Sequence, residues 1–379
     1  MEQLTNPPLP ADTALLGTGE KDDILALSLR DIEAFLVAFN EPKFRAKQIF
    51  NWLHEKMVTD FEDMTNVSKS LRDILRYRFF IPQPHILNKV VSQYDGSMKY
   101  LFDFGNEVIV ETVLMKSSYG YTICVSTQVG CKMGCTFCAS HIAGFTKNLS
   151  AGQILAQVYT IQKELDKKIS NIVIMGIGEP MDNYAASMSF IRNLSSEHGH
   201  HLSQRNITIS TCGIVEKMYD LADEGLTVTL AISIHAGTDA VRQQIMPVAK
   251  RYSMAQIKKA ADNYFDKTKR RVSYEYVLIK DVNDTREQAE SLAKYLKHSP
   301  CHVNLIPLNA VSESGYLTSA GQQTKDFMKI LEKHHISTTV RISKGQDINA
   351  ACGQLRRNAM QIANQSQTIQ PTTTAQQDT

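Results

Sequence analysis

The chain begins with a helical pattern of hydrophobic positions. From residue 24 to about residue 77, apolar side chains recur three and four positions apart, as Ile32, Phe35 and Leu36 do. This spacing puts them on one face of a helix. We therefore expect a small helical accessory domain over residues 23–85.

The pattern then changes to a period of two over residues 86–116. Alternating apolar and polar segments are broken at Asp95-Gly96 and at Gly105-Asn106. Such dipeptides favour the tight turns of β-hairpins. We therefore expect a short antiparallel extension that bridges to the core.

From residue 121 onward, short apolar runs of strand length alternate with helical stretches. Ser150 with Gln153, and Ser253 with Gln256, match the capping-box pattern at the start of two of these helices. The predicted strands are residues 122–125, 171–175, 206–211, 227–234, 272–279 and 303–307, with 338–342 as a final addition. Repeated βα units imply a parallel sheet with right-handed crossovers, and about six of them give an α/β fold with a partial (β/α)6 barrel. We place this barrel at residues 117–345.

The segments at the two ends lack any period. Residues 1–22 mix Pro, Thr, Gly and acidic residues, and residues 361–379 are rich in Gln and Thr. Both ends are therefore expected to be disordered. Residues 346–360, between the barrel and the tail, are predicted to form a loop that carries a cysteine.

Composition narrows the function classes only slightly. The 379 residues include 41 Lys and Arg and 39 Asp and Glu, a net charge of +2, which neither demands nor excludes a nucleic-acid partner. Two local basic clusters stand out: Lys43, Arg45 and Lys47 in the helical domain, and Lys267, Lys269, Arg270 and Arg271 before a predicted strand. By pattern alone such runs are usually a solvated face.

The distribution of apolar residues and cysteines bears on location. No stretch approaches the roughly eighteen apolar residues that span a bilayer, and the start has no signal-peptide pattern. The chain contains seven cysteines, an odd number that fits a reducing compartment better than a disulfide framework. We therefore expect a cytoplasmic protein without a membrane segment.

Three of the cysteines form the strongest chemical motif. Cys131, Cys135 and Cys138 have the spacing C-x3-C-x2-C. A four-iron cluster takes four ligands, so three thiolates leave one iron open to a small molecule. This spacing, with Phe137 before the last cysteine, resembles that of the radical S-adenosylmethionine (SAM) enzymes, whose open iron chelates SAM. A zinc knuckle with His141 as fourth ligand is the alternative, although structural zinc sites usually pair ligands from two separated loops.

Polar residues follow several of the predicted strands. Residues 176–180 read Gly-Ile-Gly-Glu-Pro, in which the glycines let the backbone approach a ligand and Glu179 supplies a carboxylate. Four more polar residues stand at or just after the ends of other strands: Ser210, Ser233, His235 and Asn309. Strand ends of a βα barrel meet at one rim. These residues therefore predict a polar pocket that faces the three-cysteine loop.

The remaining cysteines differ in their surroundings. Cys352 lies between small residues on a permissive backbone, which is typical of an accessible thiol. Cys124 is on the strand that leads into the three-cysteine loop, so we expect Cys352 to be reactive and Cys124 to be near the same chemistry. Cys212 and Cys301 are interpreted as small apolar core residues.

These motifs together resemble one family over residues 24–355. The matching runs are residues 41–50, 124–131, 176–180, 233–236, 304–307 and 351–355. They are similar to the RlmN-type radical SAM adenine methyltransferases of ribosomal and transfer RNA. The resemblance implies methylation of carbon 2 of one adenine in the peptidyl-transferase region of 23S rRNA, and of the adenine next to the anticodon in some tRNAs.

The resemblance also implies a mechanism, because carbon 2 of adenine has no lone pair with which to attack the methyl group of SAM. Cys352 accepts a methyl group from one SAM as a thiolate nucleophile. A second SAM at the [4Fe-4S] cluster is cleaved to a 5′-deoxyadenosyl radical, which takes hydrogen from methylated Cys352 so that the new carbon radical adds to the adenine. Two SAM molecules are therefore used per turnover.

Other positions take their roles from the same resemblance. Glu111 matches the proton acceptor, although by pattern alone it would be an exposed residue on an edge strand. Cys124 matches the resolving thiol, which forms a transient disulfide with Cys352. The positions that match SAM contacts are Gly178, Glu179, Ser210, Ser233, Ile234, His235 and Asn309.

We also expect a monomer that binds 23S rRNA and tRNA and takes electrons from a donor such as flavodoxin. Lys43, Arg45 and Lys47 are expected to hold RNA phosphates, and the target adenine must leave its stack to reach the site. The nearest alternative is a relative that methylates carbon 8 of the same rRNA adenine and confers antibiotic resistance. A further alternative is a zinc-bearing RNA-binding protein without catalysis.

Overall fold

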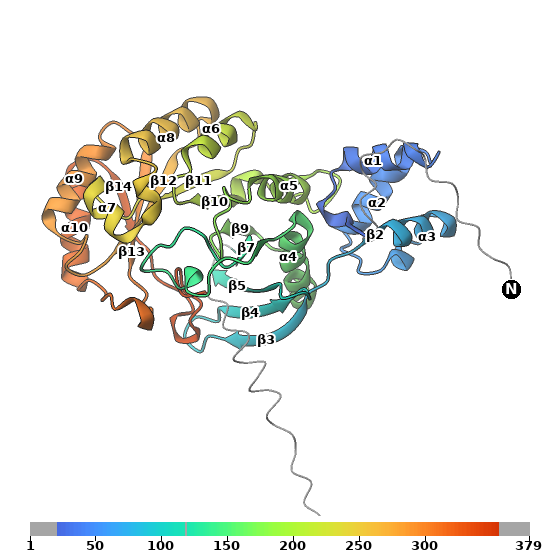
Figure 1. Cartoon of the computed structure of the whole chain (residues 1–379), viewed down its shortest axis with the longest axis horizontal. Coiled ribbons are helices and arrows are strands. Elements are labelled where there is room, and N and C mark those ends of the chain that lie inside the picture. The colour runs from blue at the N-terminus through green and yellow to red at the C-terminus, as the bar shows by residue number, and fades with distance from the viewer. Residues whose placement is uncertain (1–20, 118–119, 356–379) are drawn as a thin grey trace, which may run out of the picture.

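The computed structural model describes residues 21–117 and 120–355, and its centre is one twisted sheet (Figure 1). In the described part of the chain this sheet has ten strands in the order β14-β13-β12-β11-β10-β9-β6-β5-β4-β3. Their bounds are β3 His85–Val91, β4 Met98–Asp103, β5 Ile109–Ser117, β6 Gly120–Cys124, β9 Asn171–Ile174, β10 Ile207–Thr211, β11 Thr229–Ser233, β12 Val272–Leu278, β13 Cys301–Pro307 and β14 Ser337–Val340.

The strands from β6 through β9 to β14 pair in parallel and form the partial barrel. The strand positions predicted from the sequence are confirmed to within two residues at either end. Both predicted capping boxes are present, at Ser150 and at Ser253. The helices on the outer side are α4 Ala151–Leu165, α5 Tyr184–Ser195, α6 Val215–Asp223, α7 Asp239–Ile245, α8 Met254–Thr268, α9 Arg286–Leu296 and α10 Gly321–Lys333.

The antiparallel extension continues the barrel sheet and is not a separate layer. Both hairpin turns lie where the sequence predicts them, with Gly96 and Gly105 at φ of 68° and 77°. Strand β5 pairs with β4 on one side and with β6 on the other. Consequently β5 is an interior strand, and its side chains are more buried than the sequence pattern indicated.

The helical domain consists of α1 Leu29–Ala38, α2 Phe44–His54 and α3 Lys69–Arg78, and it lies at one end of the molecule beyond α4 and α5 (Figure 1). A short parallel pair of strands, β1 Asp22–Asp23 and β2 Phe79–Phe80, closes it. The side chain of Asn193 on α5 donates to the backbone oxygens of Leu25 and Leu27, both at 3.0 Å.

Asp23 fixes the start of the helical domain to the N-terminus of α4. Its carboxylate accepts a hydrogen bond from the hydroxyl of Ser150 at 2.5 Å. Gly152 leaves the necessary room, because a Cβ atom there would lie 2.2 Å from the Asp23 oxygens. Burial raises the pKa of Asp23 to about 6, against the opposing effect of these hydrogen bonds.

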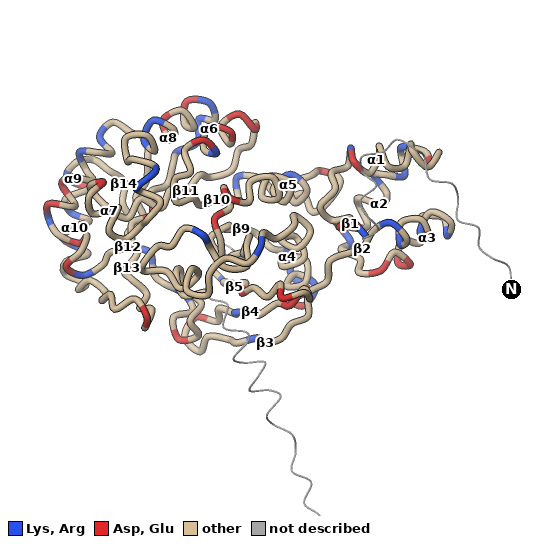
Figure 2. Tube along the Cα trace, viewed as in Figure 1, with Lys and Arg blue, Asp and Glu red and all other residues tan. Residues whose placement is uncertain are grey.

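Within the described residues no helix is long and apolar enough to cross a membrane. Lys, Arg, Asp and Glu are interspersed over the outer helices (Figure 2). The predicted disordered ends lie outside the described residues, except for Lys21 and Asp22. Cys301 is buried in the main core, as predicted.

Candidate active site

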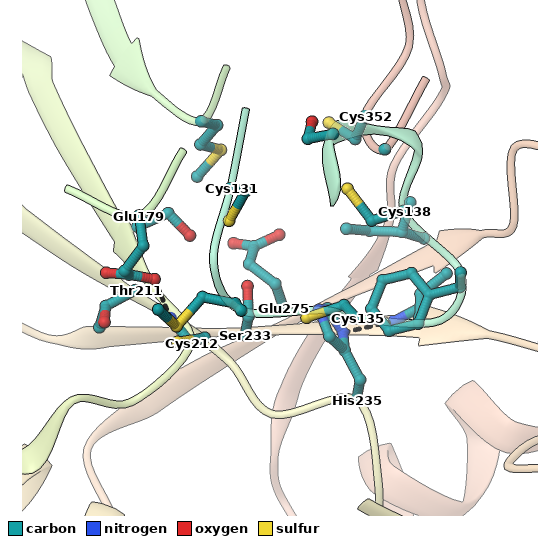
Figure 3. Close-up of a pocket in the computed structure, with 18 of the residues that line it drawn as sticks. Cys131, Cys135, Cys138, Glu179, Thr211, Cys212, Ser233, His235, Glu275 and Cys352 are labelled. Atoms are coloured by element: carbon teal, nitrogen blue, oxygen red, sulfur yellow. Dashed lines mark hydrogen bonds between the residues drawn. The ribbon is translucent and has the colours of Figure 1, made fainter. Parts of the chain in front are cut away.

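The loop after β6 brings the three clustered cysteines into one pocket at the ends of the barrel strands (Figure 3). The figure shows the sulfur atoms of Cys131, Cys135 and Cys138 arranged around a common space, with Cys352 next to Cys138. The sequence-predicted residues that line this same pocket are Gly178, Glu179, Ser210, Ser233, His235, Asn309 and Cys352. The structure therefore brings the predicted polar rim together in one pocket.

The chemistry of the three thiols fits an iron-sulfur cluster. Burial raises the pKa of Cys131 to about 12 and raises those of Cys135 and Cys138 as well. Thiolates that are costly to form in isolation need the positive charge of bound iron. Among the described residues, no three His, Cys, Asp or Glu side chains converge on one metal position. A cluster with one thiolate per iron does not require such convergence.

His141, the fourth ligand of the zinc alternative, is not among the residues that line this pocket. Its ring Nδ1 lies 2.6 Å from the backbone oxygen of Cys138, within a short turn. Its position is therefore explained by local backbone contact.

Glu179 is held by backbone donors on both carboxylate oxygens. It accepts from the N–H of Met181 at 3.0 Å and from that of Cys212 at 2.8 Å. Burial raises its pKa even so, because its exposed fraction is only 4%. Gly178 before it has φ of 108°, and a Cβ there would lie 2.6 Å from the Gln128 side chain. The glycine thus lets this loop pack against the segment after β6.

His235 forms the floor of the pocket beside the three-cysteine loop. Its Nδ1 accepts a hydrogen bond from the N–H of Val277 at 3.0 Å, and its ring meets Phe137 edge to face at 5.1 Å. Burial, followed by the charge of Arg242, lowers its pKa to about 3. The imidazole is therefore neutral at physiological pH.

The C-terminal loop is tied directly to the cluster loop. The N–H of Ala139 donates to the oxygen of Gly353 at 2.7 Å, and the hydroxyl of Ser140 donates to that of Leu355 at 2.9 Å. The side chain of Asn309 donates to the oxygen of Cys352 at 3.1 Å. These contacts hold the exposed Cys352 thiol beside the three partly buried ones.

A second pocket adjoins the first and contains Cys124. Both pockets are lined by Cys352, which therefore faces the three-cysteine loop on one side and Cys124 on the other. Burial, and then the proximity of Cys352, raise the pKa of Cys124 to about 12. The structure thus brings together two thiols that lie at opposite ends of the barrel sequence.

Two predicted site residues lie outside the pocket surfaces. The side chain of Ile234 is fully buried, and its backbone N–H donates to the oxygen of Glu275 at 3.1 Å. Glu111 lines neither pocket and forms an ion pair with Lys99 at 3.0 Å. The expectation from pattern alone, an exposed Glu on an edge strand, is wrong, because Glu111 is 7% exposed on the interior strand β5.

Sequence reasoning missed several residues of the site, of which three bear most on its chemistry. Arg341 and Glu275 line the first pocket, and the backbone N–H of Cys212, interpreted only as core, binds Glu179. Cys212 is indeed buried, at 6% exposed, but its side chain also lines the pocket. The signal for Glu275 was available, because a carboxylate in the buried run of residues 272–279 has to find a partner.

Comparisons with known proteins agree with this geometry. Residues 22–81 match the model of the ribosomal RNA large subunit methyltransferase N-terminal domain, and residues 125–296 match that of the radical SAM superfamily. Probable dual-specificity RNA methyltransferases RlmN are similar: that of Lachnoclostridium phytofermentans is 51% identical, covering 89% of this chain and 95% of the relative. That of Clostridium novyi is 46% identical, covering 89% and 98%.

A solved structure is similar over the same length. The crystal structure of a radical SAM methyltransferase from Sphaerobacter thermophilus superposes with a TM-score of 0.84 at 40% identity, covering 89% of this chain and 99% of that one. The matches therefore cover both the helical domain and the barrel. The chain belongs to the RlmN family of radical SAM dual-specificity RNA methyltransferases.

Proposed function

We propose that this chain methylates carbon 2 of adenine in RNA through a methylated Cys352 and a transient disulfide with Cys124. The substrates are the peptidyl-transferase adenine of 23S rRNA and the adenine next to the anticodon of tRNAs. The observation that carries the proposal is the position of Cys352, which lines both the three-cysteine pocket and the pocket of Cys124. A thiol that carries the methyl group needs access both to the SAM in the three-cysteine pocket and to the thiol of Cys124.

In this proposal the first pocket holds a [4Fe-4S] cluster through Cys131, Cys135 and Cys138 and binds SAM. When bound, the cluster supplies the electron that turns SAM into a source of a carbon radical. The SAM contacts come from Gly178, Glu179, Ser210, Ser233, Ile234, His235 and Asn309. Ile234 is included from the family resemblance alone, because it does not line the pocket.

Cys352 has two successive tasks. As a thiolate it accepts a methyl group from one SAM by displacement, and in methylated form it gives up a hydrogen, so that two SAM molecules are used per turnover. Its exposure in the structure suits the first task. Its place between the two pockets suits the second task, because the methylene group on its sulfur has to reach the adenine from the SAM pocket.

Glu111 is proposed to accept the proton from carbon 2. Successive side chains of a strand alternate between faces, so Glu111 shares a face of β5 with Val113 and Met115. Both of these line the Cys124 pocket. Lys99, which pairs with Glu111, also donates to the backbone oxygen of Asn349 at 3.2 Å, three residues before Cys352. This ion pair holds the Glu111 carboxylate next to the loop that carries Cys352, which supports a role near the reacting carbon.

The helical domain is proposed to hold RNA by its phosphates. Lys43, Phe44 and Lys47 are exposed at the start of α2, and Phe44 is 57% exposed. Exposed basic and aromatic residues together suit an RNA surface. Arg45 contributes less, because it donates to Gln48 and to the oxygen of Asn66. We further propose a cytoplasmic monomer served by an electron donor such as flavodoxin.

The direct test is product analysis. The protein is purified without oxygen, loaded with iron and sulfide, and incubated with SAM, a reductant and an unmodified 23S rRNA fragment. The digested RNA should contain 2-methyladenosine. Finding 8-methyladenosine would overturn the carbon-2 assignment, and finding no methylated adenosine despite an intact cluster would overturn the activity.

Three cysteine variants test the residue roles. Cys352→Ala should abolish turnover, and Cys124→Ala should accumulate a covalent RNA–protein adduct. Cys301→Ala is the matched control, since it removes a buried thiol from the main core outside both pockets. Free release of product by Cys124→Ala would contradict the resolving role.

A further inference from the structure

Arg341 lies at the junction of the two pockets. It directly follows β14, where its backbone N–H donates to the oxygen of Leu305 at 2.8 Å and extends the parallel pairing. Among the described residues, those that line both pockets are Met175, Ile306, Arg341 and Cys352. Arg341 is the only one of these with a permanent charge, so it is the cation placed between the two reaction spaces.

A chain of polar groups, in which Glu275 is buried, holds this guanidinium. Its Nη1 lies 3.4 Å from a carboxylate oxygen of Glu275, whose other oxygen accepts from Asn304 at 2.8 Å. Asn304 in turn accepts from the hydroxyl of Thr339 at 2.8 Å. Glu275 is 4% exposed, so the surrounding residues fix the position of its carboxylate. The contact to Glu275 uses one nitrogen, whereas a guanidinium carries five N–H donors and can bind a second anion.

The proposed reaction needs such a cation at this place. Release requires Cys124 to act as a thiolate, yet burial strongly disfavours its ionisation. The titratable or charged groups that line its pocket are Cys352, Arg341 and Lys344. Lys344 is engaged at the rim, where its ammonium donates to the backbone oxygen of Lys116. Arg341 is thus the cation placed to compensate a charge on Cys124.

We propose that Arg341 is a positioning residue for product release, whose guanidinium stabilises the Cys124 thiolate beside the sulfur of Cys352. This inference rests on the function proposed above. Cys124 loses its proton to solvent, and the thiolate attacks the sulfur of Cys352 in the Cys352–CH2–adenine adduct. The S–S bond forms as the bond from that sulfur to the methylene carbon breaks. The electron pair stays with the methylene carbon, which takes a proton to become the methyl group. The two sulfurs together lose the two electrons by which this carbon is reduced.

Single-turnover reactions on RNA test this role, with cluster-loaded full-length protein. Arg341→Met should methylate Cys352 at the wild-type rate but accumulate the RNA–protein adduct, with release slowed about tenfold, because loss of a nearby opposite charge shifts a pKa by about one unit or more. Lys344→Met removes a charge from the same pocket and should behave as wild type. Release by Arg341→Met at the wild-type rate would overturn the inference, as would an equal defect in Lys344→Met.

A second outcome separates thiolate stabilisation from SAM binding. If Arg341→Met slows methylation of Cys352 as much as it slows release, the guanidinium serves SAM and the inference is wrong. The pH dependence of Cys124 alkylation, read by peptide mass spectrometry, gives an independent measure. Arg341→Met should need a pH about one unit higher for the same rate, and an unchanged profile would contradict the proposal.

Arg341→Lys guards against a fold defect, because it keeps the charge while losing the planar fork. It should retain an alkylation profile close to wild type, and a profile like that of Arg341→Met would overturn the claim that charge is what matters. Failure of the proposed function is distinguishable: wild type would then form neither methylated Cys352 nor an adduct. Failure of the Arg341 inference leaves both intact in wild type.

Discussion

Gly353 accepts a hydrogen bond from the backbone N–H of Ala139 at 2.7 Å, and this bond joins the residue after Cys352 to the residue after Cys138. The C-terminal loop is therefore attached to the cluster loop by the main chain itself. Gln354 adds to this attachment, because it accepts from the N–H of Ala351 at 3.3 Å and donates to the oxygen of Ala310 at 3.1 Å. The position of the Cys352 thiol depends on these contacts.

Gln354→Ala should loosen the loop that carries Cys352. The variant loses two hydrogen bonds of a side chain that is 7% exposed, a loss of about 1–2 kcal/mol in local stability. Amide hydrogen exchange in residues 351–355 should then become roughly tenfold faster or more. Gln322→Ala on α10, whose exposed side chain bonds only locally to Asp326, is the control. Unchanged exchange near Cys352 would show that the main-chain bonds suffice.

Glu179→Gln should weaken SAM binding more than a loss of charge alone would. Both carboxylate oxygens of Glu179 accept backbone N–H groups, and the amide NH2 of Gln would have to face one of these donors. The mismatch costs about 1–3 kcal/mol, which corresponds to about tenfold or more in affinity if it is expressed in binding. Equilibrium dialysis with SAM measures the effect. Glu216→Gln, at an exposed position on α6, should bind like wild type.

Acid should destabilise the junction between the helical domain and α4. His54 is fully buried, its Nδ1 lies 2.9 Å from the hydroxyl of Tyr159, and burial lowers its pKa to about 3. The unfolded chain takes up this proton near pH 6.5, so stability is complete above that pH and falls as the pH drops toward 3, by up to about 1.4 kcal/mol per pH unit for one group.

Urea unfolding at several pH values between 7 and 5 checks this prediction. His54→Gln keeps a polar side chain but cannot take up the proton, so its unfolding free energy should depend less steeply on pH than that of wild type. His85→Gln, which changes an exposed histidine, should leave the slope unaltered. Parallel slopes for His54→Gln and wild type would refute the assignment.

Removal of the exposed charges at the start of α2 should weaken RNA binding and reduce its dependence on salt. Lys43→Gln with Lys47→Gln loses two possible phosphate contacts, each worth about 0.7–0.9 in the slope of log affinity against log salt. Titration of a labelled 23S rRNA fragment at several salt concentrations measures this slope. Lys325→Gln with Lys333→Gln, at exposed positions on α10, is the matched double control. Equal slopes for the two double variants would exclude α2 as the RNA contact.

Local patterns were enough to predict the strands and the polar rim. A buried parallel strand such as 172–175 reads as one apolar run. The ends of such strands must meet at one edge of the sheet, so the sequence alone places Ser233 and His235 at this edge. The three-cysteine loop carries its chemistry in its spacing. The strands, the polar rim and the three-cysteine loop can be predicted because each is determined by residues that are close together in the sequence.

Long-range pairing could not be predicted in the same way. Arg341 follows an ordinary polar strand, and nothing in its neighbourhood in the sequence points to Glu275, which is 66 residues away. Glu111 lies on a strand whose two partners are set by the whole sheet order, so its burial could not be derived from the alternation of residues 110–113. The burial of Cys212 could be predicted from its residue type. Its place in the pocket could not, because it depends on the contact with Glu179.

The carboxylate of Asp23 at the start of α4 has a mechanical consequence. Helix α4 is the first helix after the loop that carries Cys131, Cys135 and Cys138, and Gly152 permits the helical domain to be fastened to its first turn. A bulkier side chain at position 152 would push the two apart. This junction therefore helps to set the separation between the surface of α2 that is proposed to hold RNA and the sulfur of Cys352. That separation limits how far the modified base can lie from the RNA segment that α2 holds.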